Sequence, residues 1–147
     1  MITLWCAVFL LLAAPVPLGL FSRDALCADN RVENINLVNA VSGTYTEDDY
    51  AHLTVQTEYV VAKRYRYWKY EISIEMTDGA VFSFSNKDFY RWDSDTKDVC
   101  LDKMLEIRGL FEPEEITVKG AENVDEVSAY YSFTEQQEGK LTELFSH

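Results

Sequence analysis

Histidine, cysteine and clustered glycine are all scarce in this chain of 147 residues. The two histidines, His52 and the terminal His147, do not form a His-x-x-x-His pattern, so the sequence predicts no metal site. The six glycines are scattered singly, which argues against a loop that binds the phosphates of a nucleotide. We therefore expect neither a metal nor a cofactor, and we assign no catalytic residue.

Basic residues are also few, because 13 Lys and Arg stand against 25 Asp and Glu, giving a formal net charge of −12. Nucleic acids are bound through clustered Lys and Arg that neutralise phosphates, so this acidic balance argues against a nucleic-acid partner. At 48% hydrophobic residues the chain is too apolar to be disordered. Its length is that of one domain.

The amino-terminal segment has no charged residue from Leu4 to Phe21. Within it, the stretch Trp5 to Ala14 is wholly apolar and has the length of a signal-peptide core. Two prolines then interrupt any helix, and a small-x-small pattern follows at Ala25-Leu26-Cys27, the type of site that signal peptidase cleaves. We expect residues 1–27 to be a signal peptide and residues 28–147 to form a single globular domain.

This leader predicts a secreted or otherwise extracytoplasmic protein. The alternative is an uncleaved anchor, although the apolar stretch is barely long enough to cross about 30 Å of hydrocarbon. Membrane contact is expected only if the leader is retained. If cleavage falls before Cys27, a disulfide between Cys27 and Cys100 is an option, whereas cleavage after Cys27 leaves Cys100 as a lone thiol. On its apolar helix face Cys100 is expected to be a core residue.

Alternation of apolar and polar residues predicts several strands. It is clear over His52–Ala62 and Arg66–Met76, and weaker over Ile35–Tyr45. Asp78-Gly79 is the type of pair that forms a tight hairpin turn, and Ala80–Phe84 then continues the apolar pattern on a return strand.

The second half of the chain shows helical spacing. Apolar residues, Leu105 among them, recur every three or four positions from Lys97 to Phe111, which predicts an amphipathic helix. A short strand is expected over Glu115–Lys119 and a loop over 121–129, before a capping box at Thr134-Glu-Gln-Gln137 begins a short helix. The predicted fold is α+β: a curved antiparallel β-sheet of about five strands, with one main helix packed on it and a short C-terminal helix.

The segment 63–70 differs in composition from the rest of the chain. It holds four cations and four aromatic residues, whereas residues 29–62 hold six acids against one base and residues 112–147 hold nine against two. Such a segment is suited to binding an anionic or sugar-bearing partner through cation–π and stacking contacts. The candidate partner-binding residues are Arg64, Tyr65, Arg66, Tyr67, Lys69, Arg91 and Trp92.

A structural interpretation of the same segment remains open. In it, Trp68 and Tyr70 fill the core, while the cations of the strand pair with carboxylates of the chain itself. The two interpretations differ on Tyr65 and Tyr67, which alternation places on the face opposite Trp68. Two large exposed tyrosines there would favour a binding surface.

We expect a small extracytoplasmic binding domain that acts without catalysis on a protein or glycan partner. One alternative is a minor extracellular hydrolase that uses His52 and nearby carboxylates, since acid pairs need no sequence motif. Another is a structural subunit, in which the exposed aromatic residues would form a contact between the copies of an oligomer.

Overall fold

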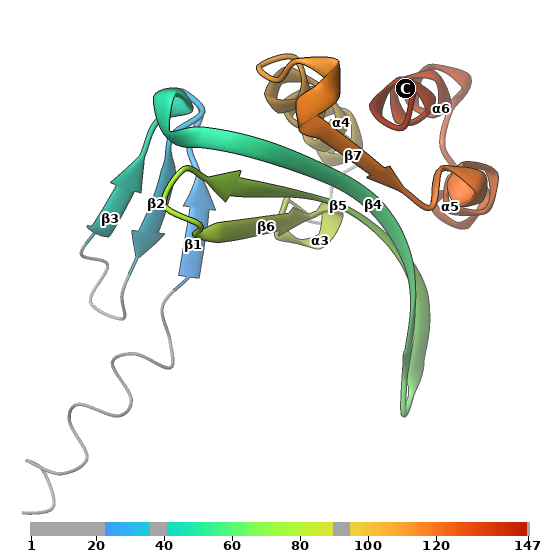
Figure 1. Cartoon of the computed structure of the whole chain (residues 1–147). Coiled ribbons are helices and arrows are strands. Elements are labelled where there is room, and N and C mark those ends of the chain that lie inside the picture. Colours follow the sequence, from blue (N-terminus) through green and yellow to red (C-terminus); the bar gives the residue numbers. More distant parts are fainter. Residues whose placement is uncertain (1–22, 36–40, 90–94, 147) are drawn as a thin grey trace, which may run out of the picture. The chain divides into compact units, whose positions relative to one another are not determined.

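A computed structural model describes residues 23–35, 41–89 and 95–146 and confirms the α+β class (Figure 1). The chain divides after Asp48 into two compact units, which we call unit 1 and unit 2. The domain boundaries expected from the sequence stay a prediction. Short 3-10 turns span Glu47–Asp49, Pro113–Glu115 and Ala121–Asn123.

Unit 1 contains a three-stranded antiparallel sheet of β1 (Arg23–Leu26), β2 (Val32–Ile35) and β3 (Val41–Tyr45). The segment 35–45, expected as one strand, therefore contributes to two strands, β2 and β3. Most of the predicted signal peptide lies outside the described residues, but its last residues form β1. Cleavage after Cys27 would thus remove β1, one of the two strands that pair with β2.

Unit 2 contains a four-stranded sheet in the order β6-β5-β4-β7. Its strands are β4 (Tyr50–Ala62), β5 (Tyr65–Met76), β6 (Val81–Ser85) and β7 (Ile116–Lys119). The predicted hairpin is confirmed, since β5 and β6 pair across a turn in which Gly79 has a φ of 86°. The sheet is mixed, because β7 pairs with β4 in parallel whereas the other neighbouring strands are antiparallel.

The helices of unit 2 are α3 (Asn86–Phe89), α4 (Asp95–Arg108), α5 (Val124–Tyr131) and α6 (Glu135–Leu144). The predicted capping box is confirmed: the Gln137 amide donates to Thr134 Oγ1, and the Thr134 amide donates to Gln137 Oε1. The loop predicted over 121–129 is wrong, because most of it lies in α5. Val124 and Val127 occupy one helical turn and are both buried, a signal too short to be recognised by periodicity.

The core of unit 2 lies between one face of the sheet and the helices α4, α5 and α6, which cover that face (Figure 1). On this face the side chains of Leu53, Tyr70, Ile72 and Ile74 are completely buried. Ile72 and Ile74 stand opposite Phe84 and Phe82 of β6, as expected for alternate residues of paired strands. None of the helices in the described ranges is both long and apolar enough to span a membrane.

The β4–β5 hairpin extends beyond its neighbouring strands. On one side β6 pairs only with Glu71–Glu75, and on the other β7 pairs only with Leu53–Gln56. The remaining residues of the hairpin form a two-stranded ribbon that curves away from the sheet (Figure 1). We call residues 59–68 the ribbon tip. This tip contains most of the cation-rich segment singled out from the sequence.

Candidate functional site

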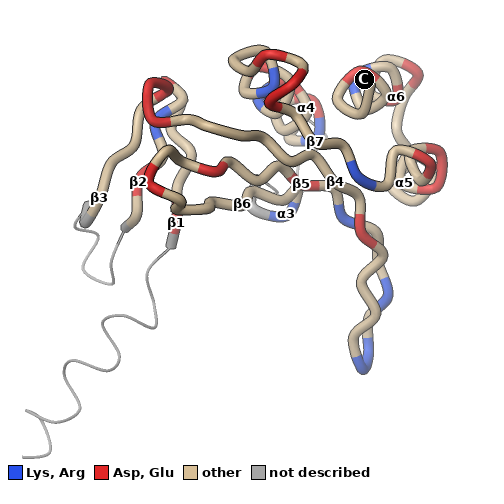
Figure 2. Tube along the Cα trace, viewed as in Figure 1, with Lys and Arg blue, Asp and Glu red and all other residues tan. Residues whose placement is uncertain are grey.

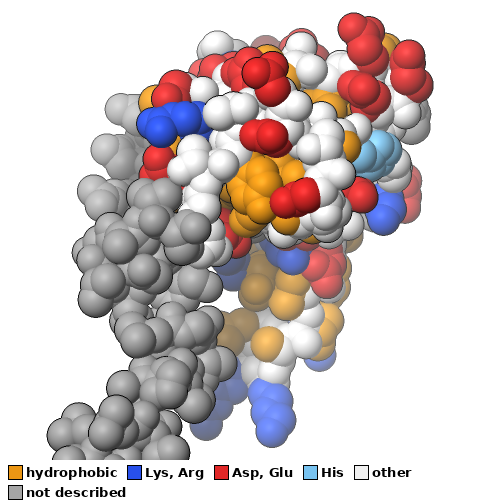
Figure 3. All heavy atoms as spheres, turned by 60° about the vertical axis from the view of Figure 1, so that its left-hand side comes forward, with side chains coloured by type: hydrophobic (Ala, Val, Ile, Leu, Met, Phe, Trp, Pro, Cys, Tyr) orange, Lys and Arg blue, Asp and Glu red, His pale blue; other side chains and the backbone are white. Residues whose placement is uncertain are grey.

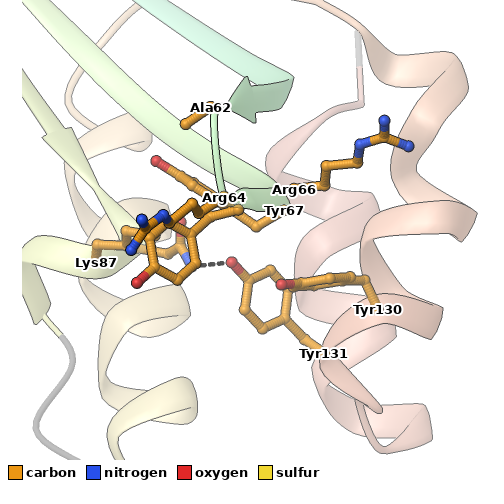
Figure 4. Close-up of a pocket in the computed structure, with 9 residues that line it drawn as sticks. Ala62, Arg64, Arg66, Tyr67, Lys87, Tyr130 and Tyr131 are labelled. Atoms are coloured by element: carbon orange, nitrogen blue, oxygen red, sulfur yellow. Dashed lines mark hydrogen bonds between the residues drawn. The ribbon is translucent and has the colours of Figure 1, made fainter.

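A groove of about 970 Å³ lies between the ribbon tip, the start of α3 and the end of α5 (Figure 4). Among the described residues, its lining consists of three cations, four tyrosines, one asparagine and one alanine, without a carboxylate. These residues are Ala62, Arg64, Tyr65, Arg66, Tyr67, Asn86, Lys87, Tyr130 and Tyr131. The groove therefore combines positive charge with flat aromatic surface in a chain that is acidic overall.

Strand alternation sets the direction of the side chains on the ribbon. In β5, Tyr65 and Tyr67 share one face, while Arg66 and Trp68 share the other. Trp68 packs on Tyr59 of β4, with ring centroids 5.1 Å apart. Tyr65 is 71% exposed, so no described part of the protein covers it. A large tyrosine left this open favours a binding surface over a purely structural role.

A chain of hydrogen bonds fixes the inner end of the groove. The Tyr131 hydroxyl of α5 donates to the Trp68 carbonyl at 2.6 Å and accepts from Asn86 Nδ2 at 2.8 Å. The Asn86 Oδ1 in turn accepts from the Tyr70 amide at 3.3 Å. Asn86 is completely buried, so these bonds are shielded from water. They join α3, α5 and β5 into one preformed wall.

Packing between aromatic rings also stabilises this wall. Tyr131 stacks on Phe133 at 5.6 Å and meets Tyr70 edge-on at 5.8 Å. Tyr130 packs edge-on against Tyr131 and is itself 49% exposed at the mouth of the groove. Such edge-to-face contacts between rings stabilise a fixed arrangement beyond simple burial.

The groove cations are largely uncompensated. Lys87 Nζ lies 3.0 Å from the centroid of the Tyr67 ring, a cation–π contact, and it forms no ion pair with a carboxylate whose side chain the structure describes. Neither Arg64 nor Arg66 forms an ion pair with a carboxylate of the described residues, and Arg66 extends away from Tyr67 and Lys87 (Figure 4). Figure 2 shows that Lys and Arg positions gather along the ribbon tip while acidic positions are frequent elsewhere, and Figure 3 shows the side chains of both kinds.

Lys69 has a different environment from the other cations of the segment. Its Nζ lies 2.8 Å from Glu58 and 2.9 Å from Glu71, and it does not line the groove. Burial of the ammonium group opposes its charge, but the hydrogen bonds to both carboxylates outweigh this and raise the pKa of Lys69. The structural interpretation, in which aromatic residues fill the core and cations pair with carboxylates, thus fits Lys69 and the completely buried Tyr70. It does not fit Arg64 and Arg66.

Replacing Lys69 with methionine is expected to lower the free energy of unfolding by about 1–3 kcal/mol, because it leaves the Glu71 carboxylate buried with fewer partners. The Glu71 side chain is only 10% exposed and keeps a hydrogen bond from Gln56. Urea titration measures the loss. Glu58→Gln is the matched control, since that carboxylate is 53% exposed and its removal should cost less. Equal losses in the two variants would contradict a structural role for the Lys69–Glu71 pair.

The remaining sequence-predicted residues lie elsewhere. Arg91 and Trp92 are outside the described residues. His52 Nε2 lies 2.8 Å from the Thr117 hydroxyl of β7. Within the described ranges no group of three His, Cys, Asp or Glu side chains is placed to hold a metal ion. Cys100 is buried in α4, the position expected of a core residue.

Sequence reasoning missed five lining residues: Ala62, Asn86, Lys87, Tyr130 and Tyr131. The adjacent tyrosines were visible as a pair, but the helix that orients them was predicted as a loop. Lys87 is the second residue of the short helix α3, and nothing in its sequence surroundings predicts that it stacks on Tyr67. Comparison with protein-family models, with curated proteins and with solved structures finds no match to this chain.

Proposed function

We propose that this chain is an exported binding domain that holds an anionic partner, a protein or a glycan, in the groove at its ribbon tip. This proposal rests on the composition of the groove, whose described lining combines Arg64, Arg66 and Lys87 with four tyrosines and has no carboxylate. In a chain of net charge −12, this local concentration of positive charge attracts anions to the groove. The exposed tyrosine rings add stacking area at low conformational cost.

Support for a binding role also comes from the pre-organised wall of the groove. The hydrogen bonds of Tyr131 and Asn86 join groups of the protein itself and hold the wall in place, so binding requires little reordering of the protein. The uncharged, apolar stretch from Leu4 to Phe21, which is typical of a signal peptide, supports export.

The test is charge reversal in the groove, measured as binding of two labelled probes, heparin and a capped (Glu-Val)3 peptide. Arg64→Glu and Lys87→Glu are each expected to weaken the binding of at least one probe by about tenfold or more, because a desolvated charge contact is lost and a repulsion replaces it. Lys119→Glu is the matched control, since it makes the same change of net charge at an exposed residue outside the groove. Higher salt should weaken the wild-type interaction.

Two outcomes would overturn the proposal. In the first, neither probe binds the wild-type chain at low salt. In the second, Lys119→Glu weakens binding as much as the two groove variants, which would mean that only the net charge matters. Circular dichroism of each variant verifies that the fold is retained.

A further inference from the structure

The groove lies along an open edge of β5. The neighbouring strand β6 ends at Ser85, where the chain turns into α3. No described strand therefore pairs with this side of β5 between Tyr65 and Tyr70. From Glu71 toward the ribbon tip, two backbone groups on this edge form hydrogen bonds with side chains and not with a strand. The Tyr70 amide donates to Asn86 Oδ1, and the Trp68 carbonyl accepts from the Tyr131 hydroxyl.

The backbone groups further along the edge can be placed by alternation. In an antiparallel pair, successive residues direct their N–H and C=O groups to opposite sides of the strand. Trp68 and Tyr70 direct theirs away from β4, as their bonds to α5 and α3 show. Arg66 therefore directs its N–H and C=O the same way, into the groove that it lines. No hydrogen bond from the described residues satisfies these two groups.

Cations flank both faces of this edge. Lys87 lies over Tyr67 on one face of β5, and Arg66 projects from the opposite face. Side chains of a strand placed beside β5 would alternate between these two faces. A carboxylate on either face of the added strand would thus lie near a cation. The groove tyrosines would contact its other side chains.

We propose that the groove binds an acidic peptide segment in extended conformation, which pairs with β5 at Arg66 as a short antiparallel strand in line with β6. This proposal rests on the proposed function and names its partner as a polypeptide. The backbone donor and acceptor of Arg66 favour a peptide over a glycan, because main-chain hydrogen bonds provide affinity in strand addition while flanking side chains provide specificity. A residue opposite Arg66 would exchange two hydrogen bonds with it.

The test compares Arg66→Pro with Arg66→Ala, using the fluorescein-labelled, capped (Glu-Val)3 peptide and fluorescence anisotropy. Both variants lose the same charge, but only proline removes the N–H. Because this N–H points away from β4, proline breaks no bond of the β4–β5 ladder and is acceptable at a strand edge. Arg66→Pro is expected to bind the peptide about tenfold more weakly than Arg66→Ala, the effect of one lost backbone hydrogen bond at an interface.

A second measurement keeps the proposal falsifiable if Arg66→Pro does not fold. The same peptide with every peptide nitrogen methylated has the same charges but no backbone donors, and its binding to the wild-type chain should be at least about tenfold weaker. Equal binding of both peptides, or of both Arg66 variants, would overturn strand addition. The flanking cations would then merely protect the edge against aggregation.

The outcomes also separate this inference from the proposed function. If heparin binds in a manner sensitive to Lys87→Glu while the peptide does not bind, the anion-binding groove stands and the peptide strand is refuted. If neither probe binds, both proposals fall. If the mass of the wild-type chain in sedimentation rises with concentration and falls in Arg66→Pro, the edge is occupied by a second copy, and the acidic peptide is refuted as its partner.

Discussion

Leu101→Ala is expected to lower the free energy of unfolding by about 2–5 kcal/mol, the range for truncating a buried leucine. Leu101 is completely buried on the face of α4 that packs into the core of unit 2, together with Met104 and Ile107. Truncation removes apolar contact area and leaves a cavity that neighbouring side chains fill only in part. Urea titration followed by circular dichroism measures the loss.

Leu105→Ala is the matched control for this prediction. It makes the same chemical change in the same helix, but Leu105 is only half-buried. Because folding buries less apolar surface at Leu105, its truncation should lower the free energy of unfolding clearly less than that of Leu101. A loss below about 1 kcal/mol for Leu101→Ala would mean that α4 is peripheral to the core.

Gly120→Ala is expected to cost about 2–4 kcal/mol, from left-handed backbone strain together with a disrupted hydrogen-bond cluster. Gly120 has a φ of 74°, and a Cβ there would collide with Thr57 Oγ1 and approach Asn123 Nδ2 to 3.1 Å. Thr57 Oγ1 donates to the Gly120 carbonyl at 2.8 Å, which ties β4 to the turn before α5. Thermal or urea unfolding measures the cost.

Gly79→Ala separates the two contributions. Gly79 also has a positive φ, 86°, but a Cβ there would meet no atom within 4 Å. Only the backbone strain, about 1–2 kcal/mol, is expected at this turn. If the two alanine variants unfold with the same loss, the contact between Thr57 and Gly120 contributes nothing measurable. Because α5 carries Tyr130 and Tyr131, Gly120→Ala should also weaken binding of the peptide probe, whereas Gly79→Ala should not.

Elements with a strong local pattern could be predicted from the sequence. The hairpin of β5 and β6 is such a case, because strict alternation assigns each side chain to a face and Asp78-Gly79 fixes the turn. The start of α6 is another, because the capping box involves residues only three positions apart. Neither prediction required knowledge of distant residues.

Elements defined by distant partners could not be predicted in the same way. The parallel pairing of β7 with β4 joins Ile116 to Leu53, and no local pattern specifies which strand a short strand will join. The helix α5 has only two buried valines, and its stability depends on packing against β5 more than on its own periodicity. The groove wall likewise depends on a bond between Tyr131 and Trp68, which are 63 positions apart.

The sequence by itself determined the α+β class and the position of an unusual cation–tyrosine segment, because periodicity and composition are properties of neighbouring residues. Only the tertiary structure decided which of those cations are compensated. Strand register places Glu58 opposite Lys69 and so neutralises it, whereas Arg64 and Arg66 lie where the ribbon extends beyond its neighbours. Charge pairing and groove formation depend on which elements, far apart in the sequence, lie side by side in the fold. The positions of α3 and α5 beside the ribbon are therefore properties of the folded chain.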